Sequence, residues 1–138
     1  MSSEWEEGIA LVKRVKGSSY RDLRVWQDAM TLAESCYSLT RTLPKEELFG
    51  MSSQIRRSAT SIPANIAEGF GREQPRPFIL FLRVAQGSLK ELETHLLLAE
   101  KVKLASELAI APLLMNCEGI GKMLRALIRS LQKRAVEI

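Results

Sequence analysis

Hydrophobic residues recur at steps of three and four along most of this chain, a spacing that places side chains on one face of an α-helix. The pattern predicts helices over residues 22–42, 49–68 and 77–102, and a fourth that begins after Ser106 as its N-cap. Pro44 ends the first segment. Four amphipathic helices with short connections predict an all-α fold, an antiparallel up-down-up-down four-helix bundle.

Each predicted helix carries one apolar seam. Further apolar residues flank the seam of the third helix, and we expect them to widen its buried face. The seams are Leu23, Trp26, Met30, Ala33, Tyr37 and Thr40; Ile55, Ala59, Ile62 and Ile66; Phe78, Leu82, Ala85, Leu89, Leu92, Leu96 and Ala99; and Ile110, Leu113, Cys117, Ile120, Leu124, Leu127 and Leu131. The flanking residues are Phe81, Val84, Leu97 and Leu98.

Proline and glycine punctuate these segments. Pro63 lies inside the second segment, where a missing N–H and a crowded preceding turn predict a kink or a local break. Gly69 and Gly71 are expected to stop that helix. Pro77 suits the first turn of the third helix.

The chain divides into an N-terminal arm, residues 1–19, and a bundle domain, residues 20–138. Trp5, Ile9 and Val12 have helical spacing, so a short amphipathic helix is predicted in the arm before Gly17 interrupts it. Three functions stay open for the arm: a frayed tail, a contact with a partner, or a strap over a neighbouring subunit.

Charge is distributed unevenly along the 138 residues. Residues 1–50 hold seven Lys/Arg against eight Asp/Glu, whereas residues 51–138 hold thirteen against eight. A basic excess in one part of a protein suits an anionic partner such as nucleic acid, although solubility explains it equally well. No apolar run reaches the roughly 18 residues of a membrane span, and no signal peptide precedes the bundle. Cys36 and Cys117 lie on predicted apolar helix faces, which favours buried, reduced thiols and therefore a cytoplasmic protein.

The residues carry no recognisable catalytic or metal-binding arrangement. His95 is the single histidine, and it has no serine or cysteine at the spacing of a nucleophile–base pair. One histidine and two thiols on apolar faces do not make a metal site, so no cofactor is expected. Glu91 and Glu93 lie on different helix faces and form no carboxylate pair. These absences predict a protein without enzymatic activity.

A polar stripe follows the second predicted helix. It consists of Gln54, Ser58, Ser61, Asn65 and Glu68, at steps of three and four. A solvent face would carry more Lys and Glu than this segment has. We therefore predict a partly buried network between helices or between subunits. Helix 22–42, with Trp26, and the small-residue face around Pro63 are expected to take part in subunit packing.

Two sets of cations are candidates for phosphate contact, because a guanidinium group binds phosphate through a fork of hydrogen bonds. The first set consists of Arg56, Arg57, Arg72, Arg76 and Arg83, and the second of Arg125, Arg129, Lys133 and Arg134. Ion pairs with carboxylates of the bundle are the alternative for Arg56 and Arg57. Stacking platforms for bases are not evident, so any contact is expected with the backbone of the nucleic acid.

Several motifs resemble a known family. They are Tyr20-Arg21-Asp22-Leu23-x-Val25-Trp26-Gln27, Ser53-Gln54-Ile55-Arg56-Arg57-Ser58, Ser61-Ile62-Pro63-Ala64-Asn65-Ile66-Ala67-Glu68-Gly69, and Phe81-Leu82-x-x-Ala85-x-Gly87-Ser88-Leu89-x-Glu91-Leu92-Glu93-Thr94. Together they resemble the bacterial four-helix bundle family of 23S rRNA intervening-sequence proteins, over about residues 20–131. The run Ser61–Gly69 is the most specific of them. The segment Gln74–Pro77 is richer in proline than the corresponding family loop, and the arm falls outside the match.

The resemblance implies a basic, ring-like homo-oligomer without enzymatic activity, and a pentamer in the related accessory variability determinants of diversity-generating retroelements. In that branch the ring binds nucleic acid and a reverse transcriptase. Two functions are therefore expected for this chain: electrostatic binding of RNA or DNA, or a protein adaptor that holds a partner such as a reverse transcriptase.

Overall fold

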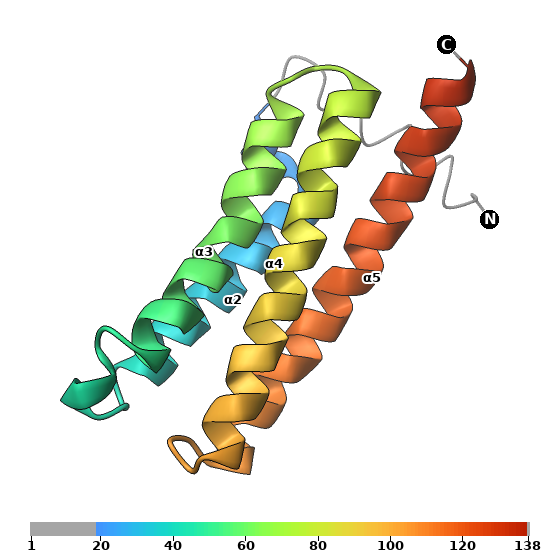
Figure 1. The fold of residues 1–138 in the computed structure, drawn as a ribbon. Helices are drawn as coiled ribbons and strands as arrows, with labels where there is room; N and C mark the ends of the chain where they lie inside the picture. Colours follow the sequence, from blue (N-terminus) through green and yellow to red (C-terminus); the bar gives the residue numbers. More distant parts are fainter. Residues whose placement is uncertain (1–18, 138) are drawn as a thin grey trace.

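The computed structural model describes residues 19–137, with side chains described up to Ala135. Four long helices lie side by side in this part of the chain (Figure 1). They are α2 (Arg24–Thr40), α3 (Met51–Phe70), α4 (Pro75–Lys101) and α5 (Glu107–Glu137), with the short 3₁₀ turns η1 (Tyr20–Asp22) and η2 (Lys45–Glu47) before α2 and α3. The predicted arm, residues 1–19, lies outside the described residues except for Ser19.

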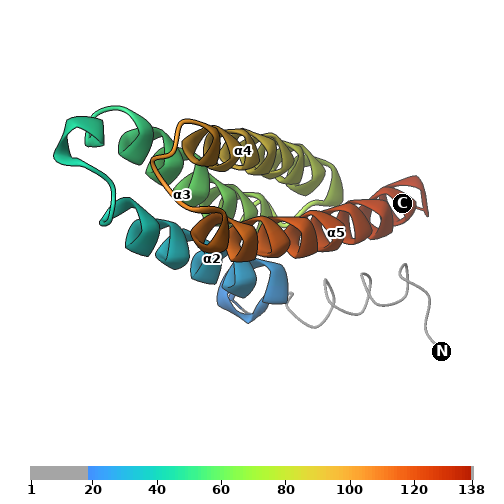
Figure 2. The same cartoon turned by 90° about the horizontal axis from the view of Figure 1, so that it is seen from below.

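The four helices form a closed bundle in which each packs on two others. Helix α3 packs on α2 and α4, and α5 packs on α4 and α2. The view along the bundle shows the same arrangement (Figure 2). Consecutive helices are neighbours joined by short connections, so the chain runs up and down, as the pattern predicted. None of the described helices is long and apolar enough to cross a membrane.

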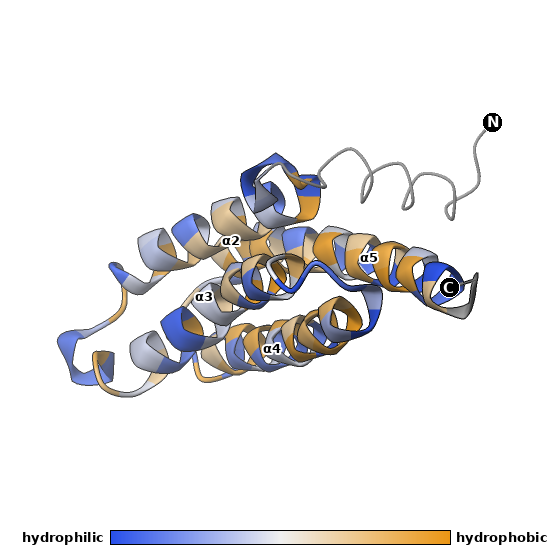
Figure 3. Cartoon of the chain, turned by 90° about the horizontal axis from the view of Figure 1, so that it is seen from above, coloured by the Kyte–Doolittle hydropathy of each residue, from blue (hydrophilic) through white to orange (hydrophobic). Residues whose placement is uncertain are grey.

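The predicted seams of α3, α4 and α5 are confirmed. Every residue of these three seams is at most 5% exposed, and together they make up most of the hydrophobic core. Hydrophobic and hydrophilic positions alternate along each helix as it turns (Figure 3). Burial of these Leu and Ile side chains stabilises the bundle by about 1.5–3 kcal/mol each.

The predicted seam of α2 is wrong in part. Leu23, Ala33 and Thr40 are buried, but Met30 is 46% exposed and Tyr37 36% exposed, and Trp26 is only half-buried. The core contacts of α2 come from a second apolar set, displaced by about one residue around the helix: Val25, Ala29, Leu32, Cys36 and Leu39. Both sets of apolar residues on α2 fit the helical period. The smaller and aliphatic side chains of the second set enter the core, whereas the rings of Trp26 and Tyr37, which carry polar groups, stay at its edge.

Helix α4 also exposes apolar residues that were expected to be buried. Val84, Leu97 and Leu98 are all more than two-fifths exposed, whereas Phe81 is half-buried. The seam on α4 already fills the space against α3 and α5, and a helix in a bundle of four has one outward face. The widened buried face is therefore wrong for these three side chains.

Proline and glycine behave differently from the prediction in α3. The helix continues through the buried Pro63 without a break, because packing against α2 and α4 outweighs the loss of one backbone hydrogen bond. Gly69 lies within the helix rather than after it. Gly71 follows the last residue but has φ −66°, and the left-handed residue of the turn is Glu73, with φ 59°.

The starts of the last two helices are set by their first residues. Helix α4 begins at Pro75, two residues before the predicted start, because a proline needs no backbone donor in the first turn. Helix α5 begins after Ser106, whose Oγ accepts a hydrogen bond from the N–H of Ala109 at 3.2 Å. The predicted N-cap is thus confirmed.

Candidate nucleic-acid interface

The two adjacent arginines of α3 reach neighbouring helices on opposite sides. The Arg56 guanidinium lies over the Tyr37 ring, 4.7 Å from its centroid, and Nε donates a hydrogen bond to Thr40 Oγ1 at 2.8 Å. Both partners belong to α2. Consecutive residues on an α-helix point about 100° apart, so Arg57 cannot join this contact.

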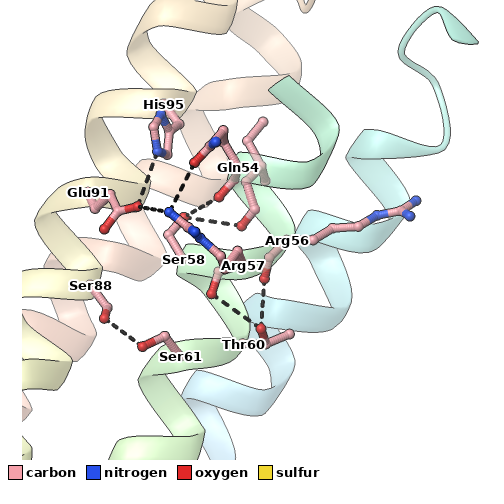
Figure 4. A network of polar contacts seen from close by, with 10 residues as sticks. Gln54, Arg56, Arg57, Ser58, Thr60, Ser61, Ser88, Glu91 and His95 are labelled. Atoms are coloured by element: carbon pink, nitrogen blue, oxygen red, sulfur yellow. Dashed lines mark hydrogen bonds and ion pairs between the residues drawn. The ribbon is translucent and has the colours of Figure 1, made fainter. Parts of the chain in front are cut away.

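Arg57 turns toward α4 instead, as the close-up in Figure 4 shows. Its Nη2 lies 3.9 Å from Glu91 Oε1 and 3.5 Å from Gln54 Oε1. The same carboxylate oxygen is 3.5 Å from His95 Nε2. The side chain of Arg57 remains largely exposed, so this contact contributes at most a few tenths of a kcal/mol after solvent screening.

The remaining cations of the first set each have a local contact or stand at the surface. Arg72 Nη2 lies 3.5 Å from Glu68 Oε1, and its guanidinium lies over the Phe81 ring at 5.0 Å. Arg83 donates to Gln86 Oε1 at 3.1 Å. Arg76 is exposed near the start of α4. Arg56 and Arg57 thus turn to different neighbouring helices, whereas Arg76 and Arg83, seven residues apart, share one side of α4.

The polar stripe of α3 makes its contacts within the chain. Ser61 Oγ and Ser88 Oγ are 2.7 Å apart across the α3–α4 contact. Asn65 Nδ2 donates to the Ser61 backbone oxygen at 2.8 Å and to its Oγ at 3.0 Å. Ser58 is buried, and its Oγ donates to the Gln54 backbone oxygen at 2.9 Å. The Ser61–Ser88 contact is partly buried between two helices, which is one of the two predicted alternatives, whereas the hydrogen bonds of Asn65 and Ser58 stay within α3.

The second set of cations forms a coherent strip on α5. Lys122, Arg125, Arg129 and Lys133 are all exposed, and their spacing of three and four residues places them along one side of the helix. No Asp or Glu occurs between Lys122 and Arg134. We call these four residues the α5 basic strip. Arg134, at the end of the same helix, is partly buried.

Two carboxylates lie beside the N-terminal part of the α5 basic strip. Lys122 Nζ is 3.7 Å from Glu118 Oε1, with both side chains more than two-thirds exposed. Arg125 borders a groove between α4 and α5 that Lys90 and Glu93 also line. Sequence analysis missed Lys122, although its three-residue step to Arg125 was the available signal.

A second feature missed from the sequence is an apolar groove between α2 and α3. Trp26, Met30 and Tyr37 line it from α2, opposite Pro63 and other small residues of α3. The spacing of the three α2 residues was visible, but it was interpreted as the core seam. Trp26 and Pro63, predicted to pack against another subunit, thus both lie in this groove.

The described residues contain no group of three metal-ligating side chains. His95 is close to a single carboxylate. Cys36 and Cys117 are free and buried, and burial raises the pKa of both thiols to about 12. A thiol with such a pKa is neutral and unreactive at physiological pH, so both cysteines act as core side chains.

Comparisons with known proteins agree with this fold. One solved structure is similar over 75% of this chain and 97% of its own, with 28% sequence identity and a TM-score of 0.71: a protein of unknown function from the S23 ribosomal protein family of Bacteroides thetaiotaomicron. No curated protein matches the chain. The family model of the 23S rRNA-intervening sequence protein matches residues 21–126. This chain belongs to the 23S rRNA-intervening sequence protein family.

Proposed function

We propose that this protein is a non-enzymatic helical bundle that binds the phosphate backbone of RNA or DNA through the α5 basic strip. The observation that carries the proposal is a run of exposed cations on one helix side without an intervening carboxylate. The arginines of α3 and α4 are assigned a smaller contribution, because Arg56 and Arg57 turn to different helices and do not line up on one helix side.

The dimensions of the strip suit several phosphates at once. Lys122 and Lys133 are eleven residues apart, which corresponds to about 16 Å along an α-helix. Double-stranded DNA carries one charge per about 1.7 Å of its axis, so every cation of the strip can meet a phosphate. Residues 122–134 contain no aromatic side chain for base stacking. The proposal therefore predicts contact with the backbone rather than readout of sequence.

Titration of binding across salt concentration tests this. Fluorescence anisotropy would compare the parent chain with the triple variant Arg125→Gln/Arg129→Gln/Lys133→Gln, using a structured RNA and a DNA duplex. Loss of three phosphate contacts lowers the slope of log K against log salt by about 2–3. The matched control is Arg57→Gln/Arg72→Gln/Arg83→Gln, which removes the same charge from α3 and α4 and is expected to change the slope by less than about 1.

Two results would contradict the proposal. One is an absence of binding to both nucleic acids at low salt. The other is an equal loss of slope in both triple variants, which would assign the effect to net charge rather than to the strip. Circular dichroism of each variant checks that the bundle is folded before it is titrated.

We also propose that copies of the chain associate, so that their basic strips add into one larger surface; the family resemblance implies a homopentamer. Leu80, Val84 and Leu98 are exposed and lie within about 40° of one another around α4, so they supply an apolar face for such contacts. Light scattering at several protein concentrations measures the mass. Leu98→Glu should lower the mass, whereas Leu97→Glu, about 100° away around the same helix, should lower it less. A monomer at every concentration would contradict association.

The alternative function is a protein adaptor for a partner such as a reverse transcriptase. The loop before α3 favours a protein contact, because Phe49 is 92% exposed beside the half-exposed Leu48. Exposed aromatic side chains are common anchors of interfaces. Co-purification with the product of a neighbouring reverse transcriptase gene, lost in Phe49→Ser, would support this function over the first.

A further inference from the structure

A groove between α4 and α5 lies beside the α5 basic strip, where the two helices run side by side (Figure 1). Its volume is about 410 Å³, within the roughly 300–1,000 Å³ of pockets that bury small ligands. Lys90 and Glu93 line it from α4, and the exposed Arg125 lines it from α5. Cys117 and Gly121, which are buried, form its floor.

The carboxylate of Glu93 lies inside this groove, whereas the neighbouring cation lies at the rim. The Glu93 side chain is 24% exposed and the Lys90 side chain 71%, with Lys90 Nζ 3.3 Å from Glu93 Oε2. Glu118 also lines the groove, but its side chain is more than two-thirds exposed and its Oε1 is 3.7 Å from Lys122 Nζ. Glu93 is therefore the acceptor that an occupant of the groove meets.

Arg125 brings a cation of the α5 basic strip to the opposite wall. Its Nη1 lies 3.5 Å from the position that a Cβ on Gly121 would take. The side chain thus lies back along α5 toward the N-terminus of the helix, the direction that long helical side chains favour. Among the residues that the structure describes, Arg125 has no carboxylate partner, so its guanidinium donors are available to a phosphate.

We propose that the groove takes one unpaired nucleotide of a bound RNA. The inference rests on the proposed function and adds a single base contact to the backbone contacts of the strip. The phosphate lies at the rim, between Arg125 and Lys90, and the base enters the groove with its exocyclic amine donating to Glu93. Proteins recognise unpaired RNA bases through the hydrogen-bonding groups of their edges, and a Glu carboxylate accepts from the amine of cytosine.

Charge complementarity favours a nucleotide over a protein side chain as the occupant. An acidic side chain would be repelled by Glu93 inside the groove, and a basic one would have to pass Lys90 and Arg125 at the rim. A nucleotide carries an anionic phosphate for the rim and a neutral base with donors for the interior. Leu97 and Leu114 supply apolar walls for the faces of that base. Continuity with the strip, to which Arg125 belongs, favours a nucleotide of the bound RNA over other small molecules with an anion and an amine.

The contact with Glu93 distinguishes between bases. Cytosine presents an amine where uracil presents a carbonyl oxygen, and a carboxylate accepts hydrogen bonds without donating them. An inserted uridine would therefore place its oxygen against the Glu93 carboxylate. A good base-edge contact discriminates against the wrong base by about fivefold or more.

Fluorescence anisotropy with two RNA hairpins that differ only in one bulged nucleotide tests the inference on the full chain. The parent should bind the hairpin with a bulged cytidine at least fivefold more tightly than the hairpin with a bulged uridine. Glu93→Ala should reduce this ratio to less than twofold. The matched control is Glu100→Ala, which removes the same charge from α4 seven residues further on, outside the groove, and should keep the ratio. Comparison of two RNAs within each variant cancels the effect of net charge.

A bulged 5-fluorocytidine gives a second readout that does not depend on affinity. Its ¹⁹F resonance should shift when the hairpin is saturated with the parent or with Glu100→Ala, and should shift less with Glu93→Ala, after circular dichroism has checked that each variant is folded. Equal affinity of the parent for the two bulges, with the salt dependence of the strip retained, would overturn this inference and leave the proposed function intact. A cytidine preference that survives in Glu93→Ala would also overturn it. Failure of both hairpins to bind at low salt would overturn the proposed function as well.

Discussion

Substitution of Gly69 by alanine probes a close approach of α3 and α4. A Cβ at position 69 would lie 2.7 Å from Phe81 Cβ, 3.0 Å from Phe78 Cδ1 and 3.3 Å from the Phe78 backbone oxygen. Carbon atoms pack best at about 3.5–4.0 Å, so α3 and α4 would have to separate by about 1 Å. Phe81 Cβ and the Phe78 oxygen are fixed to the α4 backbone and cannot move away by a rotamer change.

The magnitude is the difference of two terms. Overpacking a core contact costs about 1–3 kcal/mol, and the upper end applies where backbone must move. Alanine in place of a helical glycine returns about 1 kcal/mol of helix propensity. Gly69→Ala is therefore expected to lower the free energy of unfolding by about 2 kcal/mol.

Gly87→Ala is the matched control within the same helix pair. Gly87 is an exposed residue inside α4, and a Cβ there would meet no atom within 4 Å. Only the propensity term remains, so this variant is expected to raise the free energy of unfolding by about 0.5–1 kcal/mol. The two variants differ by the same methyl group and should shift stability in opposite directions.

Urea denaturation followed by helical circular dichroism measures both effects. The midpoint of the Gly69→Ala transition should fall and that of Gly87→Ala should rise, with the slope m unchanged. Protein concentration is held constant, because any association contributes to apparent stability. A Gly69→Ala protein as stable as Gly87→Ala would refute the close packing of α3 against the start of α4.

Three further predictions follow from single contacts. Burial raises the pKa of Cys36 and Cys117 from 9.0 to about 12. The contribution of the two buried thiols to the free energy of unfolding is therefore complete below pH 9 and is lost as the pH rises toward 12. At pH 8, Ellman's reagent should react with them only after the protein unfolds. Arg56→Ala removes a cation–π contact and a hydrogen bond, and should lower the free energy of unfolding by about 1–2 kcal/mol in urea. Ser61→Ala leaves Ser88 without its interhelical partner and should cost about 1 kcal/mol, whereas an equal stability of Ser61→Ala and the parent would contradict a structural function of the stripe.

The candidate interface was predictable in its residue types but not in its grouping. The sequence singles out arginines on the second helix and cations on the fourth. It does not show that Arg56 stacks on Tyr37 while Arg57 reaches Glu91, because a contact between helices depends on the side that each helix turns to its neighbours. The α5 basic strip needed no such information, since residues three and four apart share a side of any α-helix.

The amino-acid sequence by itself determined the helical class, the number of helices and three of the four seams. Local spacing, a serine N-cap and prolines act within a few residues, and one repeated period allows one choice of face for α3, α4 and α5. Tertiary structure decided the face of α2, the uninterrupted helix at Pro63 and the position of Gly69 between helices. Two sets of apolar residues on α2 satisfy the same period, so the period does not choose between them. Whether a helix tolerates a proline such as Pro63, or requires a glycine such as Gly69, depends on the residues that pack against that position. These outcomes depend on neighbours distant in the chain, which the order of residues does not reveal.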